Sequence, residues 1–270
     1  MSPAAFDLNS VKAAITGTRF AGSLVHLPTV TSTNTLALEA AQSGARTGVW
    51  VADEQTAGRG RGGHTWHSAP GEGLYLSALI RPRLALTKAL WLSLATGLAA
   101  RQAVAATSGV TPDIRWPNDL LLNKKKFGGI LVETASDPAT PPQPATLRYA
   151  VIGIGINLNH RAFPPELEPI ATSIARETGT PHFREPLLIA ILKVLDKEIS
   201  DLESPAVPDL LARFTTASTW ITGKRVHIQP SETAPGYTGT TAGLDPNGFL
   251  RVEGDDGQIH TVLSGGVREP

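Results

Sequence analysis

Apolar residues along the chain recur with two different periods, and the two periods separate predicted strands from predicted helices. Short apolar or alternating runs of five to twelve residues have the length and pattern of strands. They are interrupted by glycine, proline and asparagine, which favour turns. The pattern predicts one sheet containing strands over residues 49–53, 74–80, 113–123, 124–133 and 148–159.

Three longer segments have the period of helices. A helix is expected from the potential N-caps Thr33 and Asn34 to a stop at Gly44. A second helix, residues 87–108, repeats leucine every four positions beside a tryptophan, and we assign this stripe to the core. The third, residues 185–202, has leucines at helical spacing. The core leucines are Leu90, Leu94 and Leu98 with Trp91, then Leu188, Leu192 and Leu195.

The pattern of apolar residues changes from helical to strand-like near Trp220. From Gly223 onward, short β-like runs are separated by turn signals at residues 245–248 and 255–257. About 50 residues are near the lower limit for independent folding, so this small β-barrel is expected to dock on the preceding domain. We therefore predict two domains, residues 1–219 and 220–270.

One segment, residues 136–146, contains four prolines, so we expect a mobile surface connection without regular structure there.

Composition restricts the function. The 270 residues are 41% hydrophobic and 18% charged, with 24 basic and 24 acidic residues and a net charge of zero. A protein that wraps nucleic acid normally carries an excess of basic residues, so broad RNA binding is disfavoured. No signal peptide and no apolar stretch of about 20 residues is found, which predicts a soluble cytoplasmic protein without membrane binding. The absence of cysteine excludes disulfides and cysteine nucleophiles.

A segment rich in glycine and arginine, G-R-G-R-G-G-H-T-W at residues 58–66, follows the first predicted strand. We call it the Gly/Arg loop. Its glycines free backbone N–H groups to approach a ligand, while Arg59 and Arg61 supply planar cations suited to phosphate or carboxylate oxygens. Taken alone, the loop is equally compatible with a solvated loop or an RNA-binding patch.

Four segments together are more specific than any one of them. They are T-S-T-N at 31–34, Q-T-A-G-R-G-R-G-G-H-T-W at 55–66, R-W-P-N-D at 115–119 with K-F-G-G-I-L-V-E at 126–133, and G-I-G-I-N at 153–157. In this order and spacing they resemble the catalytic domain of biotin protein ligases. The C-terminal β unit, which contains S-G-G-V, resembles that family's SH3-like domain.

The resemblance implies both a fold and a reaction. The fold is α+β, a central mixed sheet flanked by helices as in class II aminoacyl-tRNA synthetases and biotin ligases, with a small C-terminal SH3-like barrel. The reaction joins biotin to ATP as biotinyl-5'-AMP and then passes biotin to a lysine of a biotin carboxyl carrier protein. Fixed cations and Mg²⁺ would offset the repulsion between the two anionic substrates.

The resemblance assigns a biotin site. It implies that Ser32, Thr33, Asn34 and Gln55 hydrogen-bond the ureido ring, and the first three also suit a helix cap, so we expect both roles. The loop that closes over biotin and the adenylate would contribute Arg59, Gly60 and Arg61. Lys126 would contact the biotin carboxylate and the α-phosphate in both steps, which makes Lys126 and Arg61 the expected catalytic pair, and Gly128 and Gly129 would line the same site.

The nucleotide site is assigned in the same way. Beside Arg59, Arg61 and Lys126, the resemblance implies nucleotide contacts for Trp66, Arg115, Asn118 and Asn157. Trp66 suits equally a core anchor for the loop, and Asn157 suits equally the closing of its strand. Asp119 would face the metal, although Pro-Asn-Asp is also an ordinary turn sequence.

Three residues depart from the family pattern. Thr31 replaces an acidic residue, Arg115 replaces a lysine, and His64 replaces the last arginine of the loop. The change at Thr31 is expected to affect only the helix entry. Arg115 keeps the charge with a forked geometry. His64 is mostly neutral at pH 7, which is expected to loosen the closed loop.

Other functions remain to be weighed. Octanoyl transferases need a cysteine, which is absent, and lipoate ligases share the fold but not this combination of motifs. A transcriptional repressor would need a DNA-binding domain, and only 30 residues precede the first motif, so no specific nucleic acid is expected. A non-catalytic biotin sensor is disfavoured by Arg61 and Lys126. Monomer and homodimer are both compatible with the sequence.

Overall fold

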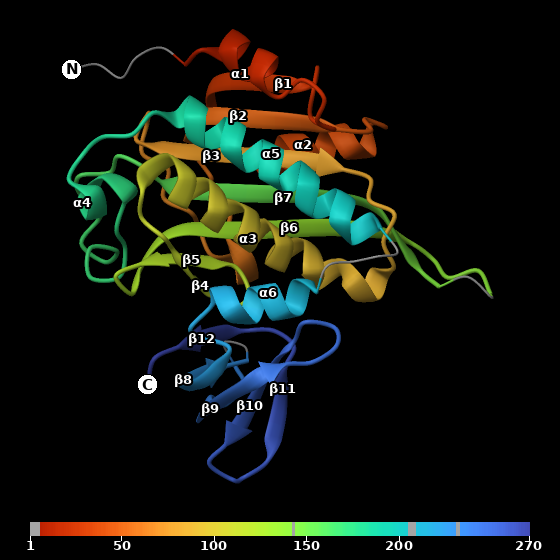
Figure 1. The fold of residues 1–270 in the computed structure, drawn as a ribbon, viewed down its shortest axis with the longest axis vertical. Helices are drawn as coiled ribbons and strands as arrows, with labels where there is room; N and C mark the ends of the chain where they lie inside the picture. Colours follow the sequence, from red (N-terminus) through yellow and green to blue (C-terminus); the bar gives the residue numbers. More distant parts are fainter. Residues whose placement is uncertain (1–5, 142–143, 205–208, 231–232) are drawn as a thin grey trace.

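A computed structural model describes residues 6–141, 144–204, 209–230 and 233–270 of the chain. A seven-stranded mixed sheet with flanking helices lies above a five-stranded antiparallel sheet (Figure 1). The helices are α1 (Leu8–Ala14), α2 (Thr33–Gln42), α3 (Ala89–Ser108), α4 (Ile174–Thr178), α5 (Arg184–Glu203) and α6 (Leu210–Ala217), with 3-10 turns η1 (Arg61–Gly63) and η2 (Leu86–Lys88). The predicted α+β class is confirmed.

The large sheet has the strand order β1-β2-β3-β7-β6-β5-β4, and only β1 and β2 run parallel. Its strands are β1 (Leu24–Val30), β2 (Gly48–Gln55), β3 (Gly73–Ile80), β4 (Asp113–Arg115), β5 (Asp119–Leu122), β6 (Lys125–Asp137) and β7 (Thr146–Asn157). The single strand predicted over residues 113–123 is wrong. A turn at Asn118, whose backbone N–H donates to the Arg115 carbonyl, divides it into the hairpin of β4 and β5.

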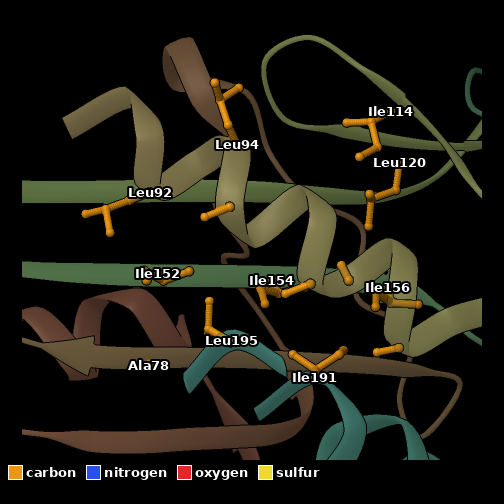
Figure 2. Close-up of a cluster of buried hydrophobic side chains, with 14 of the residues drawn as sticks. Ala78, Leu92, Leu94, Ile114, Leu120, Ile152, Ile154, Ile156, Ile191 and Leu195 are labelled. Carbon is orange, nitrogen blue, oxygen red and sulfur yellow. The ribbon is translucent and has the colours of Figure 1, made fainter. Parts of the chain in front are cut away.

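The two faces of the large sheet bury different residues. Alternate side chains of a strand point to opposite faces, so Ile152, Ile154 and Ile156 of β7 face α3 and α5 (Figure 2). The residues between them, Gly153 and Gly155, lie on the face that carries α2, and they leave room above the strand. A cavity lies above these two glycines.

Helix α3 has the predicted length, and the predicted stripe packs on the core, but the buried surface of the helix is wider than that stripe. Leu94 is buried, whereas Leu90 and Leu98 are half-buried. The cause is that α3 packs on the sheet and also on α5 and α6, so its buried surface extends around most of the helix. Trp91 is also half-buried. The core leucines of α5 are buried as predicted: Leu188, Leu192 and Leu195.

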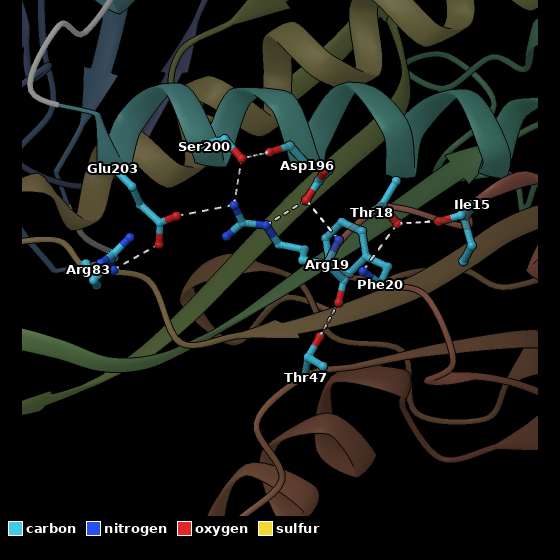
Figure 3. A network of polar contacts seen from close by, with 9 residues as sticks. All are labelled: Ile15, Thr18, Arg19, Phe20, Thr47, Arg83, Asp196, Ser200 and Glu203. Atoms are coloured by element: carbon cyan, nitrogen blue, oxygen red, sulfur yellow. Dashed lines mark hydrogen bonds and ion pairs between the residues drawn. The ribbon is translucent and has the colours of Figure 1, made fainter.

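The N-terminal segment is fastened to α5 by a polar network (Figure 3). Arg19 pairs with Asp196 at 2.8 Å and with Glu203 at 3.2 Å. Glu203 also accepts the backbone N–H of Arg83, at 3.0 Å. The network therefore joins three segments distant in sequence, and it lies on the side of the sheet that α5 covers, away from the glycines.

The C-terminal unit is a five-stranded antiparallel sheet of order β11-β10-β9-β8-β12. Its strands are β8 (Thr222–Gln229), β9 (Tyr237–Leu244), β10 (Leu250–Gly254), β11 (Ile259–Val262) and β12 (Gly266–Arg268). Both predicted turns are confirmed, at residues 245–248 and 255–257. Because β11 and β12 are its outer strands, closure into a barrel stays a prediction, as does the domain boundary at residue 219.

The C-terminal unit docks through the turn at residues 245–248. The indole N–H groups of Trp91 and Trp116 donate to the carbonyls of Asn247 and Gly248, at 3.0 and 2.9 Å. Trp91 packs against the core as predicted, and its indole N–H in addition bonds the C-terminal unit. The apolar side chains of the two units form one continuous core.

The connection between β6 and β7 also differs from the prediction. The proline-rich segment was expected to lack regular structure over residues 136–146, but β6 continues through Asp137 and β7 begins at Thr146. Its residues 142–143 lie outside the described part of the chain. No helix among the described residues is long and apolar enough to cross a bilayer.

Candidate active site

A cavity of about 50 Å³ opens between the start of α2, the Gly/Arg loop and strands β6 and β7. Its lining includes eleven of the predicted site residues: Ser32, Thr33, Asn34, Gln55, Arg59, Gly60, Arg61, Trp66, Asn118, Lys126 and Gly129. Four other predicted residues are not part of the lining: Gly128, Arg115, Asp119 and Asn157. Four separate sequence motifs therefore meet at one place.

The start of α2 is capped by Gln55 and not by its own residues. The backbone N–H of Thr33 donates to Gln55 Oε1 at 2.9 Å, and the Thr33 hydroxyl donates to the same oxygen at 3.1 Å. Ser32 occupies the N-cap position but makes no side-chain capping bond. The expected capping role of residues 32–34 is therefore wrong, because β2 brings the Gln55 oxygen to the helix end first.

Asn34 is held on three sides. Its Nδ2 donates to Glu133 Oε2 at 2.9 Å, and its Oδ1 accepts the Ser77 hydroxyl at 2.5 Å. A Cβ atom on Gly153 would come within 2.1 Å of that Oδ1, so only glycine leaves space for Asn34. Because the carboxylate of Glu133 only accepts hydrogen bonds, it fixes which end of the Asn34 amide faces it.

The Gly/Arg loop is a narrow hairpin. The backbone N–H of Trp66 donates to the Gly58 carbonyl at 2.9 Å, and the backbone N–H of Gly60 donates to the His64 carbonyl at 2.7 Å. The turn at its tip places Gly62 and Gly63 at φ of 62° and 81°, a region that strongly favours glycine. The sequence of the loop thus specifies its backbone as well as its charge.

Trp66 lies flat on two glycines that pair across β6 and β7. A Cβ atom would approach its indole within 2.6 Å at Gly155 and 3.1 Å at Gly129. The indole nitrogen is buried and has no hydrogen-bond partner among the described residues. The lining position and the packing of Trp66 agree with both predicted roles, as loop anchor and as wall of the site.

The cations of the site are held in different ways. Arg59 makes a two-bond ion pair with Glu133, at 2.8 and 3.0 Å. Arg61 donates to Asn118 Oδ1 at 3.1 Å. Burial lowers the pKa of the Arg61 guanidinium and the nearby Asp119 carboxylate opposes this shift, but an arginine stays charged at any physiological pH.

Lys126 and Arg115 share the carboxylate of Asp119. Lys126 Nζ lies 2.5 Å from Oδ1, and Arg115 lies 2.6 Å from Oδ2. Burial alone would raise the pKa of Asp119, but the two cations outweigh burial and hold it below its usual value. Both carboxylate oxygens are thus engaged by positive side chains.

This arrangement does not fit a metal site built by the protein. Asp119 is committed to two cations, and the described residues contain no group of three or more His, Asp or Glu side chains that could hold a metal ion. The expected metal role of Asp119 stays a prediction.

Asn118 and Asn157 both have structural partners. Asn118 Nδ2 donates to the Ile130 carbonyl at 2.8 Å, which leaves its Oδ1 to accept from Arg61. Asn157 is buried, and its Nδ2 donates to the Thr172 carbonyl at 3.1 Å. These contacts agree with a structural role for both residues, and their predicted contacts with the nucleotide stay predictions.

Two residues that support the site, Ser77 and Glu133, were not singled out from the sequence. Ser77 lies in a continuous apolar run and Glu133 ends a recognised motif, so neither carried a signal of its own. The signal available was the alternation of isoleucine and glycine in β7. It marks one face of that strand as closely approached by another group.

Comparisons with known proteins agree with this geometry. Residues 27–157 match the Biotin/lipoate A/B protein ligase family, and residues 221–267 match the Biotin protein ligase C terminal domain. A biotin--[acetyl-CoA-carboxylase] ligase of Mycobacterium tuberculosis is 34% identical over 87% of this chain and 81% of its own length. A bifunctional ligase/repressor BirA of Bacillus spizizenii is 33% identical over 87% of this chain and 70% of its own length.

The fold comparison points the same way. The biotin protein ligase from Aquifex aeolicus, solved in complex with biotin and ATP, superimposes with a TM-score of 0.76 and 28% identity. The match covers 92% of this chain and all of that one, so both the catalytic fold and the C-terminal sheet are shared. The chain belongs to the biotin protein ligase family.

Proposed function

We propose that this protein uses ATP to activate biotin as biotinyl-5'-AMP and transfers the biotinyl group to a lysine of a biotin carboxyl carrier protein. The observation that carries the proposal is the charge of the cavity. Lys126, Arg115 and Arg61 surround a single carboxylate, Asp119, while Arg59 and Glu133 neutralise each other. An excess of two positive charges is suited to two anionic substrates.

The first step forms a bond between a biotin carboxylate oxygen and the α-phosphorus of ATP, and it releases pyrophosphate. The two reactants repel each other, so cations near the reacting atoms lower the barrier most. Lys126 and Arg61 both line the cavity. We assign the charge stabilisation of the first step to Lys126, and the retention of the adenylate under the closed loop to Arg61. Asp119 holds the Lys126 ammonium in place until the substrates compete for it.

The second step forms an amide bond. The carrier lysine attacks the biotinyl carbonyl as a neutral amine, AMP leaves with the bonding electron pair, and the amine proton passes to solvent. The mixed anhydride formed in the first step hydrolyses readily in water. A loop that covers it protects it until the acceptor arrives, which is the role we assign to the Gly/Arg loop.

We propose that Mg²⁺ takes part in the reaction as an ion bound to the phosphates of ATP. Mg²⁺ commonly keeps several waters and binds to substrate phosphates with few protein ligands, so it does not require a protein cage. We likewise propose a cytoplasmic location, since the reaction consumes ATP, and an acceptor belonging to acetyl-CoA carboxylase, as in the name of the mycobacterial relative.

The rival within the family is a lipoate-protein ligase, because the first matched family includes both activities. The second match, to the biotin ligase C-terminal domain, favours biotin. The direct test supplies purified protein with ATP, Mg²⁺ and either biotin or lipoate, together with the carrier domain of acetyl-CoA carboxylase. Mass spectrometry should find one biotinylated lysine and no lipoylation. Lipoylation, or no modification with either acid, would refute the proposal.

A further inference from the structure

Glu133 connects two walls of the cavity without lining it. Its Oε1 accepts from Arg59 of the Gly/Arg loop at 2.8 Å, and its Oε2 accepts from Arg59 at 3.0 Å and from Asn34 of α2 at 2.9 Å. Loop, helix and strand β6 are thus joined at one carboxylate. The side chain does not belong to the cavity lining, so it is placed to support the site and not to touch a substrate.

Asn34 and Arg59, the two residues that Glu133 joins, differ in how tightly the protein holds them. Asn34 is 4% exposed and is held by Ser77 and the surface of Gly153, so the inner end is rigid. Arg59 has a side chain that is 44% exposed, and it stands on the hairpin that carries Gly62 and Gly63. Motion that opens the cavity would therefore separate Arg59 from Glu133 and leave Asn34 in place.

We propose that Glu133 is a positioning residue that holds the Gly/Arg loop closed over the adenylate by fixing Arg59 to the wall formed by Asn34. The inference rests on the proposed function. It gives Arg59 a different task from Arg61, because the guanidinium of Arg59 is committed to a carboxylate and leaves Arg61 and Lys126 to face the substrates.

The ion pair between Arg59 and Glu133 is of a strength that allows it to break and form again as the loop opens and closes. A two-bond pair between arginine and carboxylate has good geometry, but partial exposure to water keeps such pairs weak. Its loss should raise the rate of biotinyl-AMP release by about three- to tenfold, without preventing synthesis. A much stronger pair would slow the entry of the substrates.

The test measures the release of biotinyl-AMP from enzyme loaded with biotin, ATP and Mg²⁺ in the absence of carrier. Glu133→Gln removes the charge and keeps an oxygen for Asn34, while Arg59→Gln removes the other partner. Each variant should release the adenylate about three- to tenfold faster, and the double variant should be no faster than either single one. Higher salt should speed release from the native enzyme more than from Glu133→Gln.

Asp255→Asn is the matched control. Asp255 makes a similar two-bond pair with Arg225 in the C-terminal sheet, at 2.6 and 2.7 Å, so its loss removes a comparable ion pair far from the loop. Release should be unchanged in this variant. Thermal unfolding of each variant separates release from a general loss of stability.

Two results would overturn the inference. One is a Glu133→Gln variant that releases biotinyl-AMP at the native rate. The other is a double variant whose effect on that rate, expressed as free energy, is the sum of the two single effects, which would show that the two residues act independently. A native enzyme that synthesises no biotinyl-AMP would instead refute the proposed function itself, and this inference with it.

Discussion

The two faces of strand β7 differ in what they contribute to the protein. On one face Ile152, Ile154 and Ile156 are almost completely buried under α3 and α5. On the other, Gly153 and Gly155 carry no side chain, and Asn34 and Trp66 occupy the space above them. Five consecutive residues thus serve stability on one face and leave space for the candidate site on the other.

This difference shows how a sheet can carry a site without a break in its backbone pairing. Glycine inside a strand gives up packing and is usually unfavourable, so it needs a reason. Here the opposite face compensates, because bulky isoleucines anchor the strand while the bare face is approached by an amide and an indole. The comparison leads to predictions in which the two faces respond differently to substitution.

The largest effect is expected at Lys126, on the site face. Lys126→Ala removes the ammonium that Asp119 positions at the cavity, and it should lower the rate of adenylate synthesis at least a hundredfold, or about 3 kcal/mol. Biotin-dependent ATP-pyrophosphate exchange measures this rate. Lys125→Ala is the neighbouring control and should keep the native rate. Normal exchange by the Lys126 variant would remove this lysine from the chemistry.

The two faces are separated directly by Ile152→Ala and Gly155→Ala. Ile152 does not line the site, and Ile152→Ala leaves a cavity in the core that should lower the free energy of unfolding by about 2–4 kcal/mol, with biotin affinity little changed. Gly155→Ala places a Cβ atom 2.6 Å from the Trp66 indole, which must move. Its biotin affinity should fall by about tenfold or more, roughly 1.4 kcal/mol.

Urea unfolding and biotin titration calorimetry on both variants measure the two quantities. Equal losses of affinity in both variants would show that the faces are not separate in function.

The end of β7 provides a pH test. Burial, reinforced by His67, lowers the pKa of His160 to about 4. Above pH 6.5 the histidine is neutral in both the folded and the unfolded chain, and the full stability is present. As the pH falls toward 4, only the unfolded chain takes up the proton, so stability is lost.

The loss should amount to about 2 kcal/mol between pH 7.5 and 5. Unfolding of the native protein and of His160→Gln at a series of pH values measures it. The variant should show a flatter dependence in this range, and an unchanged slope would assign the acid sensitivity to other groups.

The smallest effect is expected at Arg61, in the loop above the bare face. Arg61→Gly should keep adenylate synthesis and release biotinyl-AMP, so that lysines of an unrelated protein become biotinylated several-fold more than with the native enzyme. Blotting for biotin on that protein measures the release. Leakage equal to native would show that Arg61 does not retain the adenylate.

The sequence predicted which residues line the site better than it predicted which residues hold them in place. The motifs around Arg61 and Lys126 are local, so they could be recognised one after another along the chain. The partners depend on sheet register. Gly153 faces Asn34 only because β3 and β7 are neighbours, and Glu133 reaches Arg59 across 74 residues. No local pattern encodes such contacts.

The same reason limits what the sequence shows of the fold. The stripe on α3 was inferred from one helix alone, but α5 and α6 bury side chains around most of that helix. The indole N–H of Trp91 donates to a turn 156 residues away. The turn between β4 and β5, in contrast, carries a local signal in Pro-Asn-Asp, so the single strand predicted there is an error of interpretation. Long periodic helices and strands, which carry their signal within themselves, were found.

Biotin-dependent ATP-pyrophosphate exchange by the purified native protein tests the central claim most directly. The account predicts that labelled pyrophosphate enters ATP only when biotin is present, that lipoate does not replace biotin, and that no carrier protein is needed. Exchange without biotin, exchange supported equally by lipoate, or no exchange at all would contradict the assignment of biotin activation to the bare face of the sheet.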